Sequence, residues 1–257
     1  MFIRPNRTRE KLLAGQTVHG VISTSDDPQL AELCAVAGFD YYMLDAEHGL
    51  IDPAQALNVV RACECTGITP LVRIGPKDPK LVLQYLDAGM MGVMMPGLAD
   101  EAEARMLVEA VKYPPLGRRG LGVSRASGYM AYGRDASAYL DTANRETLVI
   151  AQFEDAALLP HLDAMLAVPG LDGMMIGPRD LSLVMGHPEG PAHPAVQAVI
   201  AEVIGRCTAA GIAAGITAAS HADACAEESR GARMVLVTVQ ALLLSGARSY
   251  LGAPVQR

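Results

Sequence analysis

Three ionisable residues, Asp45, Glu47 and His48, come directly after an apolar run in the stretch DYYMLDAEHGL, residues 40–50. Charged groups beside a buried segment require a partner or a ligand. An imidazole can remove a proton from a substrate, and a neighbouring carboxylate can orient the imidazole and raise its basicity. The stretch therefore predicts a buried strand that ends at a chemical site, with His48 as the candidate base.

Two further carboxylates each follow an expected strand, where together they could hold a cation. Glu154 closes the apolar segment 148–153, and Asp180 follows the segment 172–176 in the motif IGPRDLS. Carboxylate oxygens that leave room for substrate and water suit Mg2+ or Mn2+ better than zinc. Both residues also precede helical patterns, where acids act as N-caps. The residues alone leave a metal site and a pair of caps equally open.

Other polar residues in apolar surroundings carry weaker signals. Arg73 ends an apolar strand, so it needs a carboxylate or a developing oxyanion as its partner, and a structural ion pair is the alternative. Gln152 can bind a ligand or a nearby backbone group. Asp87, in QYLDAGM, lies at the end of a helical segment, and its position alone favours a solvated helix residue.

The elements that must position these residues alternate regularly along the chain. The expected strands cover 18–24, 40–45, 69–74, 91–95, 148–153, 172–176, 212–217 and 234–238, and the expected helices cover 28–38, 53–66, 79–88, 100–112, 155–167, 194–210, 220–230 and 240–250. Strands that are apolar on both faces indicate a parallel sheet. Eight repeats predict a (β/α)8 barrel, in which chemistry is found at the carboxyl ends of the strands.

Several local signals support these boundaries. Asp52-Pro53 and Asp78-Pro79 each offer an N-cap followed by Pro at the first helical position. A glycine follows the ends of four expected helices, where a left-handed cap favours this residue: Gly38, Gly67, Gly89 and Gly211. An additional helix near 6–14 is expected to cover one end of the barrel. An open doubly wound sheet is disfavoured because no Gly-x-Gly-x-x-Gly follows a strand.

Composition narrows the class of protein. The 257 residues suffice for one barrel domain over 1–257. The net charge of −7 argues against a nucleic-acid partner, and no apolar run approaches membrane-spanning length. Five scattered cysteines and an N-terminus without an apolar signal region indicate reduced thiols and a cytoplasmic location. One long connection, about 114–146, is expected to be functional because of its length.

Seven segments, taken in order, resemble the HpcH/HpaI family of class II pyruvate aldolases. They are LDAEHG, PLVRI, YLDAGMMGVMMP, YPPLGRRG, AQFED, LDGMMIGPRDLS and HPAVQ. The resemblance runs from about residue 18 to 240. It implies a barrel enzyme that uses a divalent cation (Mg2+, Mn2+ or Co2+) and acts on a small-molecule 2-oxoacid and an aldehyde. It also implies a homo-oligomer, a hexamer built as a trimer of dimers, in which a neighbouring subunit supplies part of each site.

The resemblance assigns roles around the cation and the base. By matching position, Glu154 and Asp180 are implied to be the metal ligands. His48 is implied to be the base, acting through a metal-bound water, and Asp87 to be the acid that tunes it. This implication for Asp87 overrides the solvated-helix interpretation.

The resemblance also assigns the substrate contacts. Arg73 is implied to stabilise enolate charge, and Gln152, Asp180 and the backbone at Arg179 to contact pyruvate. Relatives usually carry a small residue where this chain has Arg179, and they often carry Trp in loops where this chain has none. We expect these differences to affect the aldehyde half of the reaction. Arg179 could bind a second carboxylate or narrow the pyruvate pocket.

The implied reaction is the reversible cleavage of a 4-hydroxy-2-oxoacid to pyruvate and an aldehyde. No Schiff-base lysine is needed, in keeping with lysines that all fall outside the expected strand ends. Three alternatives stay open at this point: a citrate-lyase-β-like acyl-CoA lyase, a catalytically silent 2-oxoacid-binding protein, and a decarboxylase or cycloaddition enzyme that uses the same enolate.

Overall fold

Eight parallel strands close into a barrel in the computed structural model, which describes residues 4–131 and 136–252. Each strand pairs with its neighbours in the sequence, and β8 pairs with β1. The strands are β1 Val18–Ser23, β2 Tyr41–Asp45, β3 Thr69–Arg73, β4 Gly92–Met95, β5 Leu148–Phe153, β6 Gly173–Ile176, β7 Ala213–Thr217 and β8 Met234–Thr238. The predicted (β/α)8 barrel is confirmed.

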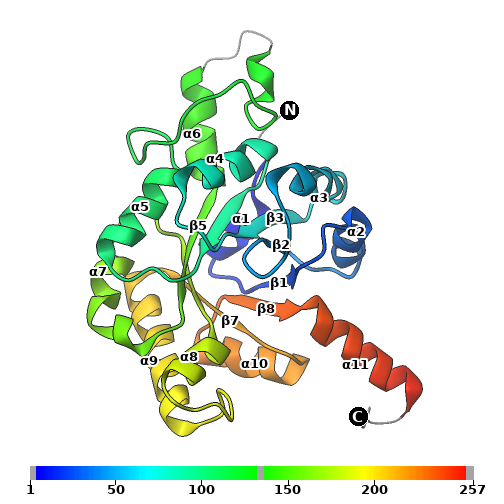
Figure 1. The fold of residues 1–257 in the computed structure, drawn as a ribbon, viewed down its shortest axis with the longest axis vertical. Helices are drawn as coiled ribbons and strands as arrows, with labels where there is room; N and C mark the ends of the chain where they lie inside the picture. Colours follow the sequence, from blue (N-terminus) through cyan, green and yellow to red (C-terminus); the bar gives the residue numbers. More distant parts are fainter. Residues whose placement is uncertain (1–3, 132–135, 253–257) are drawn as a thin grey trace.

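Helices follow the strands and surround the barrel (Figure 1). They are α1 Arg7–Leu13, α2 Pro28–Val36, α3 Pro53–Thr66, α4 Pro79–Ala88, α5 Glu101–Val111, α6 Ala136–Glu146, α7 Leu162–Leu166, α8 Pro178–Val184, α9 Pro194–Ala210, α10 His221–Arg230 and α11 Val239–Leu251, with 3-10 turns η1 Gly128–Met130 and η2 Ala156–His161. The helix expected over 155–167 is instead η2 followed by the short α7, because Pro160 interrupts it. Helices α6 and α8 were not predicted.

The predicted helix boundaries are confirmed at both kinds of cap. Asp52 accepts hydrogen bonds from the backbone of Ala54 and Gln55, and Asp78 accepts one from Lys80. All four predicted cap glycines have positive φ, as at Gly67, where φ is 84°. These caps fix where α3 and α4 begin, directly after the loops that follow β2 and β3.

Strand residues alternate between two apolar regions. Tyr41 and Met43 of β2 point into the barrel, where they pack with Leu71, Ile150 and Met175. The intervening residues of each strand face the helices in a second, larger cluster. Gly20 is required beside this interior, because a Cβ there would lie 2.1 Å from the Tyr41 ring. The period of two then turns the last residue of several strands toward the barrel axis.

The predicted additional helix, α1, covers the amino end of the barrel. The hydroxyl of Thr8 donates a hydrogen bond of 2.9 Å to the hydroxyl of Thr69, the first residue of β3. The side chain of Asn6 donates to the backbone carbonyls of Met91 and Glu146, which precede β4 and β5. The carboxyl end of the barrel therefore stays available for a site.

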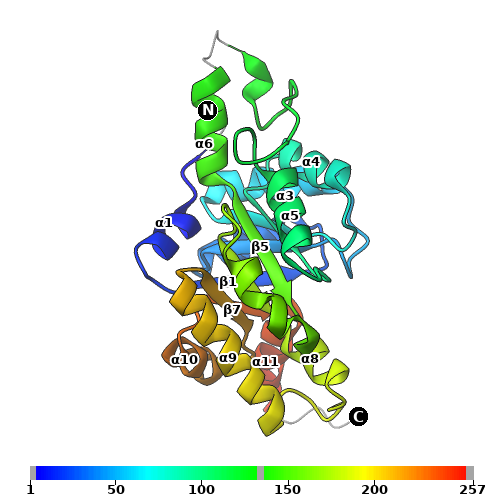
Figure 2. The same cartoon turned by 90° about the vertical axis from the view of Figure 1, so that its left-hand side faces the viewer.

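Two parts of the chain extend beyond the barrel. Helix α6 and the segment that contains η1 project at one end, and α11 runs outward from β8 (Figures 1 and 2). Helix α11 buries none of its residues, although leucines make up much of it. None of the helices within 4–131 and 136–252 combines the length and the apolar content needed to cross a membrane.

Candidate active site

A polar layer occupies the carboxyl end of the barrel, above the apolar interior. Alternation along β2 continues from Tyr41 and Met43 to Asp45, and alternation along β3 continues from Leu71 to Arg73. On β5 it leads from Ile150 to the buried Gln152. The alternation of side chains that fills the barrel interior thus also directs polar side chains of three strands toward the carboxyl end of the barrel.

Arg73 and Asp45 form the centre of this layer. The two residues are register partners on adjacent strands, and the carboxylate accepts two hydrogen bonds from the guanidinium, 2.9 Å to Nε and 2.6 Å to Nη2. Burial disfavours both charges. The hydrogen bonds and the attraction between the two charges nevertheless outweigh the cost of burial. The pKa of Asp45 is accordingly lowered, and the pKa of Arg73 is raised. Glu47 adds a second carboxylate 3.2 Å from Arg73 Nε.

Glu154 lies among negative charges and makes no ion pair with any described residue, although Arg73 is near enough to interact with it through charge. Burial raises the pKa of its carboxyl, and the charges of Glu47 and Asp180 raise it further, against hydrogen bonds from Gly97 and Gln152. The Gly97 N–H lies 3.0 Å from Oε1, and Gln152 Nε2 lies 2.6 Å from Oε2. A cation placed beside this carboxylate would relieve its repulsion by Glu47 and Asp180.

The surroundings of Glu154 include an acceptor that a ligand could engage. Gln152 Oε1 is buried and has no hydrogen-bond partner among the described residues. A Cβ on Gly177, the N-cap of α8, would lie 3.1 Å from Gln152 Nε2 and 3.4 Å from Glu154 Cβ. Asp180 stands in the first turn of the same helix and is exposed. All of these donor atoms are oxygens, a set that fits Mg2+ or Mn2+.

His48 stands on the turn that follows β2. Its backbone N–H and that of Glu47 donate to Asp45 Oδ1, which ties the turn to the Arg73–Asp45 pair. Its imidazole is 65% exposed, and Nε2 lies 3.8 Å from Glu47 Oε2. An exposed ring on a fixed turn can meet a substrate and exchange protons with water.

Two predicted residues lie apart from this group. Asp87 ends α4 near the amino end of the barrel, where it pairs with Arg119 at 3.1 Å, so the chain does not bring it to its own His48. Arg179 is exposed on α8, and its guanidinium lies near Gly190. It makes no ion pair with any described residue.

The sequence interpretation gave Asp45 and Glu47 a role as acids beside His48, and it named an ion pair with one of the acids as the alternative role of Arg73. The structure makes both of them partners of Arg73. A signal for the first pairing exists in the sequence, because Asp45 and Arg73 each end a strand and the two strands are consecutive. The pairing of Glu47 depends on a turn geometry that no periodicity encodes.

Comparisons with known proteins agree with this architecture. The sequence profile of the HpcH/HpaI aldolase/citrate lyase family matches residues 19–245. The chain is 39% identical to a hydroxypyruvate/pyruvate aldolase of Pseudomonas aeruginosa over 98% of this chain and 94% of that protein. It is 42% identical to a 2-dehydro-3,6-dideoxy-6-sulfogluconate aldolase of Pseudomonas putida over 72% of each.

Solved structures give the same result. An HpcH/HpaI aldolase/citrate lyase family protein from Burkholderia cenocepacia J2315 superposes with a TM-score of 0.89 at 30% identity, covering 96% of this chain and 98% of that one. A citrate lyase β subunit from M. tuberculosis, complexed with oxaloacetate and magnesium, shares the fold alone, with a TM-score of 0.56 at 19% identity over 89% of this chain and 93% of that one. This chain therefore belongs to the HpcH/HpaI aldolase/citrate lyase family.

Proposed function

We propose that the protein is a divalent-cation-dependent aldolase that reversibly cleaves a 4-hydroxy-2-oxoacid to pyruvate and an aldehyde. The observation that carries the proposal is the placement of Glu154 near Asp180, Glu47 and the anchored guanidinium of Arg73. Burial first, and then the charges of Glu47 and Asp180, raise the pKa of Glu154. Relatives named as pyruvate and sugar-acid aldolases support it. Citrate lyase β subunits are more distant, so an acyl-CoA lyase is disfavoured.

Glu154 and Asp180 would hold the cation, and Mg2+, Mn2+ and Co2+ are the candidates. When bound, the cation supplies positive charge beside the keto oxygen of the substrate and so acidifies the neighbouring carbon. Because the pKa of Glu154 is raised, a proton competes with the cation for this carboxylate. Cation affinity is therefore expected to increase as pH rises through the Glu154 pKa and to fall in acid.

The chain's own residues carry out the proton transfers and the stabilisation of charge. In the cleavage direction we assign His48 to remove the proton from the 4-hydroxyl, so that the bond between C3 and C4 breaks and its electrons move toward the keto oxygen. Arg73 donates hydrogen bonds to the oxyanion that develops there. Its Nη1 makes no hydrogen bond or ion pair with the described residues. The proton that His48 accepted, returned to C3, completes pyruvate.

Gln152 and the turn at Arg179 would orient the 2-oxoacid. Gln152 is buried, its Oε1 lacks a partner, and its Nε2 is bonded to Glu154, so a ligand at Glu154 meets it directly. Arg179 and Asp180 lie in the first turn of α8, where backbone N–H groups favour a carboxylate. The exposed guanidinium of Arg179 is available to a second anionic group on the aldehyde half.

The proposed assembly is a homo-oligomer, a hexamer built as a trimer of dimers, in which a neighbour's Asp87 completes each site. Two features support it. Helix α11 exposes a largely apolar surface, with Leu243 at 70% and Tyr250 at 90% exposure, and a groove of about 290 Å3 opens beside its base.

The long connection, about 114–146, packs against Asp87 through Arg119 and the Ala126 backbone, while residues 132–135 lie outside the described residues. We propose that this connection acts with Asp87 at the neighbour's site and that the enzyme is cytoplasmic.

A screen of 4-hydroxy-2-oxoacids for pyruvate release, with Mg2+, Mn2+ or Co2+ added, tests the proposal. We expect cleavage of at least one substrate, its loss with EDTA, and its loss in Glu154→Gln. In His48→Ala the cleavage rate should fall by about 10^2- to 10^4-fold while the fold persists. Full activity in EDTA, or in His48→Ala, would contradict the assignment.

A further inference from the structure

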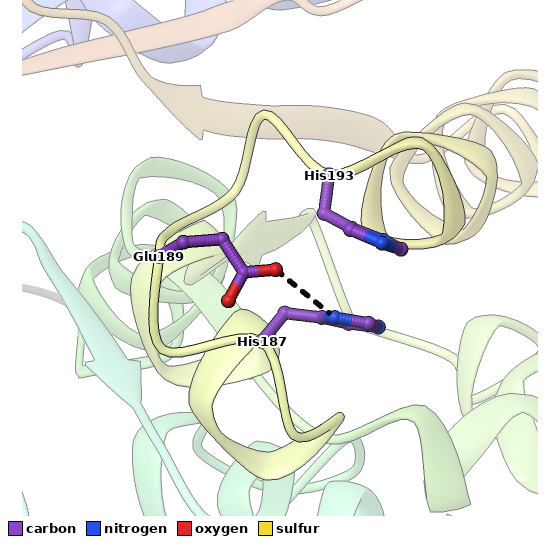
Figure 3. Close-up of side chains that lie close together, drawn as sticks. All are labelled: His187, Glu189 and His193. Atoms are coloured by element: carbon purple, nitrogen blue, oxygen red, sulfur yellow. Dashed lines mark ion pairs between the residues drawn. The ribbon is translucent and has the colours of Figure 1, made fainter.

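The connection between α8 and α9 gathers three side chains that can ligate a metal ion: His187, Glu189 and His193. One ligand atom from each lies within 4.8 Å of the other two. The two imidazole rings stack with centroids 3.5 Å apart, and the carboxylate of Glu189 is directed toward them (Figure 3). We propose that this cluster binds a borderline divalent cation, Zn2+ above all, at a site separate from Glu154 and Asp180.

The spacing of the ligand atoms fits such an ion. His187 Nδ1 and Glu189 Oε1 lie 3.3 Å apart. Two atoms each bound about 2.0 to 2.1 Å from a tetrahedral zinc ion are separated by about 3.3 Å. His187 and Glu189 hold this separation as an ion pair, which a cation bound to both would replace. The ligand atom of His193 has to approach by at most roughly 1.5 Å, which rotation of a half-buried side chain can supply, and water would fill the fourth position.

The loop backbone is held in place before any cation arrives. In the segment GHPEGPAHP, proline follows each histidine and also precedes Ala192, which fixes φ at three positions. The His187 N–H donates to the Ser182 carbonyl at 2.7 Å, and the Gly190 N–H donates to the His187 carbonyl at 3.1 Å. The Gln197 side-chain amide donates to the Pro191 carbonyl at 2.8 Å. Little conformational entropy therefore remains to be lost on binding.

Two neighbours oppose cation binding. His193 Nδ1 accepts the Ala195 N–H as the N-cap of α9, so a cation bound at this nitrogen would displace the cap, whereas one bound at Nε2 would leave it in place. Arg179 brings a positive charge near Gly190, but its side chain is exposed and Glu189 offsets it.

The two sites differ in the class of cation that they prefer. Glu154, Asp180 and Gln152 offer oxygen alone, which suits Mg2+ and Mn2+. The histidine cluster offers two nitrogens and one oxygen, which favours Zn2+, Ni2+ and Co2+. The chain is thus expected to hold two different cations at once. The second site does not depend on the proposed aldolase activity, because none of its residues belongs to the candidate active site.

Calorimetric titration of the metal-free full chain with Zn2+, in saturating Mg2+ near pH 7.5, tests this proposal. The titrated chain carries Glu154→Gln and Asp180→Asn, so that zinc cannot compete at the oxygen site. We expect one equivalent of Zn2+ to bind, and His187→Ala or His193→Ala, added singly, to lower its affinity by at least tenfold. His161→Ala removes an exposed histidine outside the cluster and is the matched control. It should leave binding unchanged.

Cobalt gives a second readout on the same chain. Co2+ bound to two imidazoles and a carboxylate in a four- or five-coordinate site absorbs visible light more strongly than Co2+ in a six-coordinate oxygen site. This band should appear with one equivalent of Co2+ and disappear in the His187→Ala and His193→Ala variants. Undiminished zinc affinity in both His187→Ala and His193→Ala would overturn the proposal, as would an equal loss of affinity in His161→Ala. The absence of zinc binding by a chain whose circular dichroism shows it to be folded would overturn it too.

Discussion

Arg73 owes its position to carboxylates on its own side of the barrel. Asp45 is 6% exposed and binds the guanidinium through both oxygens, while Glu47 approaches Nε from the following turn. A guanidinium fixed in this way needs no reorganisation when charge develops on a substrate oxygen. We therefore regard Asp45 as a positioning residue that acts through Arg73 and through the backbone of the His48 turn.

Asp45→Asn tests this role. Asn keeps the size but loses the charge and one acceptor, so we expect a loss of stability of about 1 to 3 kcal/mol at pH 7, measured by urea unfolding. Because the pKa of Asp45 is lowered in the fold, its stabilisation is present above the unfolded pKa of about 4 and is lost as pH falls below it. The difference between the two proteins should thus vanish in acid. A pH-independent difference would contradict the account.

At the scale of elements, the strands could be predicted and the details of several helices could not. Continuous apolar runs such as 148–153 identify buried parallel strands without ambiguity. Helix α6 was missed because it lies within the connection 114–146, which was interpreted as a loop, although its buried residues Tyr139, Ala143 and Glu146 follow a helical spacing. The outward direction of α11 could not be read from its sequence, because an apolar helix looks alike whether it covers its own barrel or another surface.

In the candidate site too, the positions of residues on strands could be predicted and the positions of residues on turns could not. The strand ends placed Arg73 and Gln152 correctly in the polar layer, because alternation dictates which side of the strand they face. Turns set the positions of Glu47 and Arg179, and turn geometry was not predictable here. Asp87 is a different case, because its role depends on a second chain. It stays a prediction.

Gly177 tests how closely α8 must approach β5. Its φ of −94° is open to alanine, so Gly177→Ala should fold, but the new Cβ would press on Gln152 and Glu154. We expect Mn2+ affinity to fall by about tenfold, measured by calorimetry, because the supporting hydrogen bond is displaced. Gly205→Ala is the matched control, with no atom within 4 Å of the new Cβ. It should gain up to about 1 kcal/mol in stability and keep its Mn2+ affinity. Equal affinities in the two variants would refute the packing argument.

At the scale of the whole molecule, α11 and Asp87 both indicate that one chain is incomplete alone. The helix carries a largely apolar surface that its own barrel leaves exposed, and the acid lies at the wrong end of the barrel for its own His48. Exposed apolar surface of this kind marks an interface. The proposed oligomer and the proposed completion of each site by a neighbour's Asp87 would therefore be two consequences of the same arrangement.

Charge substitution on α11 tests the assembly. Leu243 and Tyr250 share one face of the helix, so Leu243→Glu with Tyr250→Glu should prevent burial of that face. We expect light scattering to show an oligomer for the natural chain and smaller species for the variant, with loss of aldol cleavage in the smaller species. A natural chain that is monomeric, or a variant of unchanged mass, would contradict the proposed assembly.

The central claim is that Glu154 and Asp180 hold a cation that lets His48 remove a proton from a 2-oxoacid. The most direct measurement is the exchange of pyruvate methyl protons with deuterium, followed by NMR in D2O, because it needs no knowledge of the aldehyde. We predict exchange that requires Mg2+ or Mn2+, disappears in Glu154→Gln, and falls by about 10^2- to 10^4-fold in His48→Ala. Exchange that persists without a cation, or that is undiminished in Glu154→Gln, would contradict the claim.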